Sequence, residues 1–72
     1  MPAGTFEEKL GKRVRAAREG AGMSQMDVVL KSGMSLSHYQ KIERGVLDPR
    51  ISTIVKIAKL FGATLDELVG KL

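Results

Sequence analysis

The 72-residue chain is long enough for a single domain with a small core. Because cysteine is absent, disulfides and thiolate metal sites are excluded, which fits a reducing cytosol. The formal charge of +4 and the pI near 9.8 favour polyanionic partners, although such a charge is also ordinary for solubility. No apolar run approaches the roughly 20 residues that span a bilayer, and the N-terminus lacks an apolar signal core. We therefore expect a soluble, cytoplasmic protein without membrane contacts.

The first predicted helix begins after Thr5. Glu8 follows three residues later, a capping-box spacing in which each side chain accepts a hydrogen bond from a backbone amide of the first turn. Gly20 and Gly22 end the helix. Within it, four apolar residues recur at helical spacing: Phe6, Leu10, Val14 and Ala17.

Two short helices come next, separated by a glycine turn. Ser24 is placed to cap the first, with Asp27 in its first turn, and Gly33 ends it as a left-handed residue. Ser35 is placed to cap the second, which Gly45 ends. The connection "SGMS" is short enough for the second helix to lie across the first.

The final two helices follow a loop fixed by Pro49. The segment 51–61, "ISTIVKIAKLF", is apolar on all sides and predicts a buried central helix. The last helix repeats the capping-box spacing with Thr64 and Glu67. Its apolar residues are Leu65, Leu68, Val69 and Leu72.

The third predicted helix, within "SGMSLSHYQKIERG" (32–45), has two unlike faces. Tyr39 and Ile42 share the inward side, because residues three apart lie on one face of a helix. The other face lacks a carboxylate, since the only acid, Glu43, falls beside the inward positions. It carries Leu36, Ser37, Gln40, Lys41 and Arg44. A helix held this way fits the major groove of B-DNA, which is roughly 12 Å wide.

The segment "GMSQMDVVLKSGMSLSHYQKIERGVLDPRISTIVKIAKLFGATLDEL" resembles the phage-repressor-like helix-turn-helix family, also called the Xre or Cro type. The matching motifs are "SQ" at 24–25, Gly33, "IERG" at 42–45, Pro49 and "KIAKLFGATLDEL" at 56–68. The resemblance implies an all-α, five-helix lambda-repressor-like domain over residues 1–72. Helices two and three would form the helix-turn-helix, at about 24–44.

The same resemblance implies roles for individual residues. Base contacts would come from Ser35, Leu36, Ser37, Gln40 and Lys41 on the third helix. Phosphate contacts would come from Ser24, Gln25, Arg44 and Arg50, and the dipole of the second helix independently favours an anion at its start. Arg18 would form a structural ion pair with Glu43. This pairing would explain an acid on a helix that approaches DNA.

Two residues depart from the family pattern. Val29 stands where the family has a small residue between the paired helices, so the pair could be spread slightly. Leu36 stands where a polar residue is usual. Its side chain could touch a thymine methyl group, contact a protein, or read nothing.

Several residues have plain structural interpretations. His38 is the only histidine and has no metal-ligand or triad partners in register, so we expect it at the edge of the helix pair. The cations of the first helix alternate with acids and predict a solvated face: Lys9, Lys12, Arg13 and Arg15. No set of acid, base and nucleophile converges, so an enzyme is the weakest hypothesis, and no cofactor or metal is implied.

The favoured function is a sequence-specific transcriptional regulator of double-stranded DNA, with repression as the favoured sign. The alternative is an antitoxin or protein-interaction module of the same fold. Because one such domain reads few base pairs, we expect a homodimer on a two-fold operator. The apolar C-terminal residues Leu68, Val69 and Leu72 are the candidate interface, unless they face the core.

Overall fold

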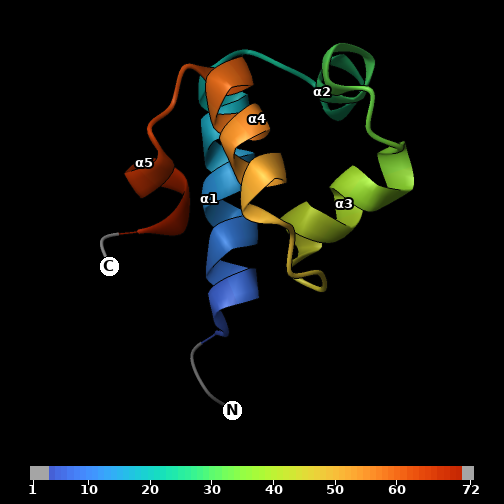
Figure 1. Cartoon of the computed structure of the whole chain (residues 1–72). Coiled ribbons are helices and arrows are strands. Elements are labelled where there is room, and N and C mark those ends of the chain that lie inside the picture. Colours follow the sequence, from blue (N-terminus) through green and yellow to red (C-terminus); the bar gives the residue numbers. More distant parts are fainter. Residues whose placement is uncertain (1–3, 71–72) are drawn as a thin grey trace.

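The computed structural model describes residues 4–70, which form five helices and no strand (Figure 1). The helices are α1 (Phe6–Gly20), α2 (Gln25–Ser32), α3 (Leu36–Arg44), α4 (Ile51–Phe61) and α5 (Leu65–Val69). The predicted all-α, five-helix class is confirmed. Between residues 4 and 70 no helix combines the length and the apolar character needed to cross a membrane.

Local side-chain caps set where four of these helices begin, whereas α4 begins without a side-chain cap hydrogen bond. Thr5 and Glu8 form both hydrogen bonds of the predicted capping box. Ser24 and Asp27 do the same at α2. At α5 the hydroxyl of Thr64 accepts from the amide of residue 67, but the described residues form only this half of the predicted box. The starts of the four capped helices could therefore be predicted from segments of four residues.

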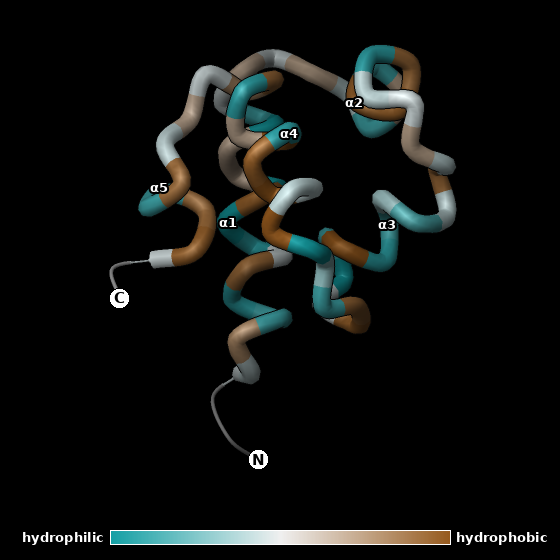
Figure 2. The backbone as a smooth tube through the Cα atoms, in the orientation of Figure 1, coloured by the Kyte–Doolittle hydropathy of each residue, from teal (hydrophilic) through white to brown (hydrophobic). Residues whose placement is uncertain are grey.

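The helices pack around α1 and α4, which lie side by side in the middle of the molecule (Figure 1). α5 packs against both from one side, whereas α2 and α3 form a pair on the other, with α2 on α4 and α3 on α1. Figure 2 shows that hydrophilic residues predominate along α3, while apolar and polar residues alternate along α1 and α4. The pair α2–α3 thus stands at one side of the domain.

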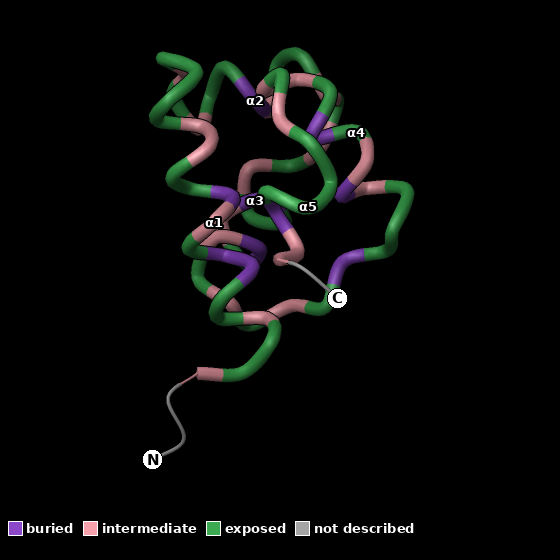
Figure 3. Tube along the Cα trace, turned by 90° about the vertical axis from the view of Figure 1, so that its left-hand side faces the viewer, coloured by how far each residue is buried: buried purple, intermediate pink, exposed green. Residues whose placement is uncertain are grey.

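The core draws on every helix, and Figure 3 shows buried stretches between exposed ones along the chain. The buried hydrophobic residues are Leu10, Val14, Val28, Tyr39, Ile42, Ile54, Ile57, Ala58 and Leu68. Leu68 is fully buried, so its assignment to a subunit interface is wrong: it closes the core between α5, α1 and α4. Val69 is partly buried against the same core, and Leu72 lies outside the described residues.

The segment 51–61 is the central helix that the sequence predicted, but it is not buried on all sides. Ile51 is 60% exposed, and Lys56 and Lys59 are exposed as well. In a domain of this size α4 has neighbours on only part of its circumference, namely α1, α2 and α5. Apolar composition alone overestimated its burial.

Gly11 allows α1 and α3 to approach closely. A Cβ atom at this buried position would lie 2.5 Å from the carbonyl oxygen of Glu43 and 2.6 Å from that of Ile42. Gly45 makes a similar contact, because its Cβ would lie 2.6 Å from the Cα of Glu8, and its φ of +75° also favours glycine. The end of α3 is therefore seated backbone to backbone on α1.

We predict that Gly11→Ala lowers the free energy of unfolding by about 1–3 kcal/mol, because the backbone must move to admit the new atom. Helix propensity alone predicts the opposite, a gain of about 1 kcal/mol. Gly20→Ala is the matched control, since Gly20 is also in α1 but has no atom within 4 Å of its Cβ position. Urea denaturation of both variants measures the difference, and equal stability would contradict the close approach.

Candidate nucleic-acid interface

The turn between α2 and α3 places α3 at the surface. Gly33 has the predicted left-handed conformation, with a φ of +78°. The hydroxyl of Ser32 accepts a hydrogen bond from the amide of Met34 at 3.1 Å, which satisfies a backbone donor within the turn. Ser35 then caps α3 by accepting from the amide of His38. α3 therefore leaves the turn in a direction that the local backbone fixes.

The two faces of α3 are as the sequence predicted. Tyr39 and Ile42 are buried in the core. The outer side carries exposed Ser37, His38, Lys41 and Arg44 and the half-buried pair Leu36 and Gln40. No acidic side chain lies on that outer side.

Glu43 points inward and pairs with Arg18 of α1. The Arg18 Nε lies 2.6 Å from one carboxylate oxygen, and Nη2 donates to the other at 3.2 Å. The two side chains are only 11% and 5% exposed. Arg18 also donates to the carbonyl oxygen of Met23 at 2.9 Å, so the same guanidinium holds the loop before α2.

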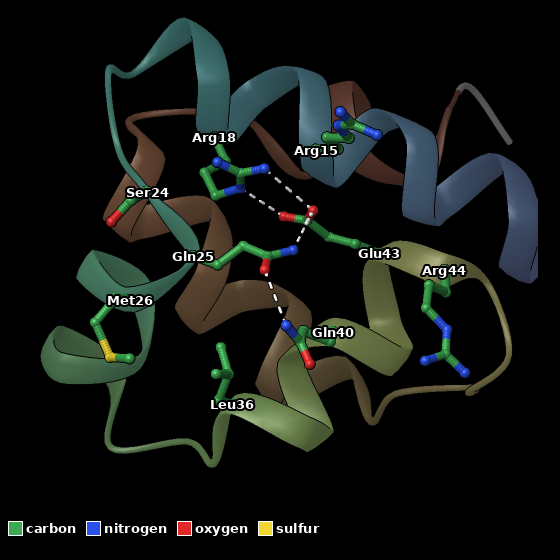
Figure 4. A pocket seen from close by; sticks show the side chains of 9 residues that line it. All are labelled: Arg15, Arg18, Ser24, Gln25, Met26, Leu36, Gln40, Glu43 and Arg44. Carbon is green, nitrogen blue, oxygen red and sulfur yellow. Dashed lines mark hydrogen bonds and ion pairs between the residues drawn. The ribbon is translucent and has the colours of Figure 1, made fainter.

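The carboxylate of Glu43 accepts two further hydrogen bonds, of which Figure 4 draws the one from Gln25. One comes from the hydroxyl of Tyr39, one turn earlier in α3. The other comes from Gln25 Nε2 at 3.1 Å, and Gln25 Oε1 in turn accepts from Gln40 Nε2 at 3.2 Å. Side chains of α1, α2 and α3 thus form one connected network, which we call the Glu43 network: Arg18, Gln25, Tyr39, Gln40 and Glu43.

Ionisation in this network follows from its hydrogen bonds. Burial alone raises the pKa of Glu43, but donors from Arg18, Tyr39 and Gln25 outweigh it and hold the pKa below its ordinary value of 4.5. Burial, followed by the hydrogen bond to Glu43, raises the pKa of Tyr39 above its ordinary range. The hydrogen bond to Glu43 also raises the pKa of Arg18. At neutral pH the network therefore contains one cation, one carboxylate and a neutral phenol.

An open groove of about 760 Å³ lies over this network. α1, α2 and α3 supply its lining: Arg15, Arg18, Ser24, Gln25, Met26, Leu36, Gln40, Glu43 and Arg44. Three arginines and one glutamate give the lining a net positive charge. Within residues 4–70 no three histidine, aspartate or glutamate side chains gather as metal ligands would.

The groove brings together some of the predicted contact residues and not others. Five line it: Ser24, Gln25, Leu36, Gln40 and Arg44. Three lie on α3 or its cap without lining it: Ser35, Ser37 and Lys41. Arg50 is an exposed residue that precedes α4, at the N-cap position.

Arg13 and Arg15 of α1 were expected on a solvated face, and the structure gives each a further role. Arg13 is partly buried and donates to the carbonyl oxygen of Val69 at 3.4 Å, which ties α5 to α1. Arg15 lines the groove. Periodicity could have placed Arg15 near Arg18, because residues three apart share a helix face.

The sequence profile described as helix-turn-helix matches residues 14–68. The regulator ImmR of Bacillus subtilis is 34% identical over 62 residues, which are 86% of this chain and 49% of that protein. The phage repressor RstR of Vibrio cholerae is 32% identical over 63 residues, which are 88% of this chain and 56% of that protein. The chain therefore spans about half the length of these two curated relatives.

A solved structure is also similar. The restriction-modification controller protein C.AhdI from Aeromonas hydrophila superimposes with a TM-score of 0.78 at 31% identity, covering 85% of this chain and 92% of that one. The chain belongs to the helix-turn-helix family, with α2 and α3 as its helix-turn-helix. This finding confirms the family assigned from the sequence motifs.

Acid should weaken the fold through Glu43. The pKa of Glu43 is lower in the folded chain than in the unfolded one. The stability that Glu43 contributes to the fold is therefore fully present above about pH 4.5, and it is lost as pH falls through the folded pKa. Glu43→Gln should cost on the order of 3 kcal/mol at neutral pH, since it leaves Arg18 without its counter-charge. Its free energy of unfolding should then fall less steeply with acid than that of the native protein.

Urea denaturation between neutral pH and about pH 3 measures both slopes. Asp27, whose pKa is lowered by its hydrogen bonds with Ser24, is present in both proteins and cancels in the comparison. Equal slopes would show that Glu43 is not stabilised as a carboxylate.

Proposed function

We propose that this protein is a sequence-specific regulator of transcription that binds double-stranded DNA with α3 in the major groove. The observation that carries the proposal is the outer side of α3, which is free of acid and held in place by the Glu43 network. An acid-free face at one side of a domain favours contact with an anionic partner. Family membership supports the same partner.

Within this proposal the polar residues divide by what they can reach. Ser35, Leu36, Ser37, Gln40 and Lys41 would face base edges, because they lie on or beside the first two turns of α3. Gln40 Nε2 donates a hydrogen bond to Gln25. This bond fixes the orientation of the Gln40 side-chain amide, including its acceptor Oε1, before DNA binds. Such fixed amides suit bidentate contacts with adenine.

The phosphate contacts would surround α3. Arg44 and Arg50 supply exposed guanidinium groups at the far end of α3 and at the start of α4. Ser24 and Gln25 lie at the start of α2 and would contact a phosphate there, because the first backbone amides of a helix favour an anion. Contacts of this type position the protein without reading sequence.

The proposal includes repression, a two-fold operator and a homodimer on DNA. Repression is supported by the resemblance to RstR, which is named a repressor. The homodimer interface cannot include Leu68, because this side chain is fully buried in the core. Other residues must form the interface. The proposal involves no catalytic step and places the protein in the cytoplasm.

Sedimentation with and without operator DNA tests the predicted stoichiometry of two subunits per operator. One subunit per operator would contradict the dimer.

Replacing Gln40 or Lys41 by Ala should weaken binding to a duplex selected from random sequence by roughly 1–3 kcal/mol, with much less effect on a scrambled duplex. Arg50→Ala should weaken both duplexes alike and lower the salt slope by about one ion. Titrations of both duplexes at several salt concentrations measure the difference. If all three variants lost affinity equally on both duplexes, the outer face of α3 would be a nonspecific basic patch.

Leu36 should contact a thymine methyl group, because it is the only apolar side chain among the proposed base-contact residues and lines the groove. Replacing thymines of the selected duplex one at a time by deoxyuridine removes single methyl groups. One replacement should weaken binding by the native protein, and the same replacement should have no effect on Leu36→Ser. Equal sensitivity of both proteins at every position would exclude the contact.

A further inference from the structure

The wall of the groove formed by α1 carries a cation that the Glu43 network does not use. Arg15 lines the groove one turn before Arg18. Whereas Arg18 is nearly buried against Glu43, the side chain of Arg15 is 65% exposed. Its position places a guanidinium beside the helix-turn-helix, on a helix that is not part of it.

The charges of the groove lining leave Arg15 and Arg44 available to a ligand. Arg18 and Glu43 neutralise each other, so the lining itself carries a charge of about +2, which Glu19, paired with Arg15 outside the lining, partly offsets. Figure 4 shows Arg15 on α1 and Arg44 on α3, with Glu43 between them in this view. Two cations from different helices around one opening suit an anionic polymer better than a single small anion.

The ion pair that Arg15 forms within α1 is weak enough to be displaced. Its Nε lies 3.4 Å from Glu19 Oε2, and the two side chains are 65% and 56% exposed. Exposed pairs of this kind contribute little to stability. The order, with arginine before glutamate, is the less favourable one along a helix, and the helix dipole disfavours an acid next to the end of α1.

We propose that Arg15 is a further DNA-phosphate contact, an inference that rests on the proposed function. Glu19 competes with the phosphate for the Arg15 guanidinium. A phosphate offers the guanidinium two parallel charge-assisted hydrogen bonds, a stronger interaction than the single long contact with Glu19. α1 thereby extends the DNA-binding surface beyond α2 and α3. Because the phosphate must displace Glu19, the Arg15–Glu19 pair reduces the DNA affinity that Arg15 contributes.

The first test compares Arg15→Gln with Lys9→Gln. Both remove one positive charge from an exposed residue of α1, but Lys9 does not line the groove. Loss of one phosphate contact lowers the salt slope by about 0.9, so between about 50 and 200 mM salt the affinity of Arg15→Gln should fall ~3.5-fold less than that of the native protein. Lys9→Gln should keep the native slope. Thermal melting followed by circular dichroism checks that both variants are folded.

The second test removes the competitor. Glu19→Gln should raise the affinity for selected and scrambled duplexes alike by about 1.5- to 5-fold, because the phosphate no longer displaces a carboxylate. In the Arg15→Gln background the same change should give a clearly smaller gain, since only the overall charge then differs. An equal gain in both backgrounds would overturn the competition.

The outcomes separate this inference from the proposed function. If the native protein binds duplex DNA with a steep salt dependence but Arg15→Gln and Lys9→Gln behave alike, the Arg15 contact is wrong and the proposed function stands. If the native protein binds neither duplex in a salt-dependent way, the proposed function is wrong and this contact falls with it.

Discussion

The carboxylate of Glu43 gathers hydrogen-bond donors from three helices: Arg18 from α1, Gln25 from α2 and Tyr39 from α3 itself. Removing a charged pair from water is costly, and an apolar pair of the same volume can be as stable. A hydrophobic contact, however, is non-directional, whereas these hydrogen bonds constrain both angle and distance. The pair therefore acts chiefly to orient α2 and α3 relative to α1.

That orientation reaches the surface through two side-chain amides. Gln25 is bonded to Glu43 on its nitrogen and to Gln40 on its oxygen, so a buried charge fixes the direction of a side chain on the outer part of α3. The backbone contributes as well, because Gly11 allows the carbonyls at the end of α3 to lie against α1. The proposed reading surface is thus held from within the domain. Little conformational freedom of Gln40 remains to be lost on binding.

The features predicted correctly from sequence depend on short-range interactions. The caps at Thr5, Ser24 and Ser35 involve residues three apart, and the left-handed Gly33 reflects one backbone position. The burial of Tyr39 follows from helical spacing. Such interactions are visible in a few neighbouring letters of the sequence, so the helices and the faces of α3 could be predicted.

The features that were missed depend on contacts between distant segments. Exposure of Ile51 and burial of Leu68 depend on which helices surround α4 and α5, and composition does not specify neighbours. The role of Gly11 appears only when α3 is placed against α1. The pair Arg18 and Glu43 was expected from family resemblance, since no local spacing relates positions 25 residues apart. The DNA contacts themselves stay predictions.

Methylation protection on a duplex selected from random sequence tests the central claim, that α3 enters the major groove, most directly. Guanine N7 lies in the major groove and adenine N3 in the minor groove, so dimethyl sulfate reports on both. The account predicts protection of guanine N7 in two patches about 10 base pairs apart, one for each subunit of a dimer. Protection of adenine N3 alone, or of neither atom at saturating protein, would contradict it.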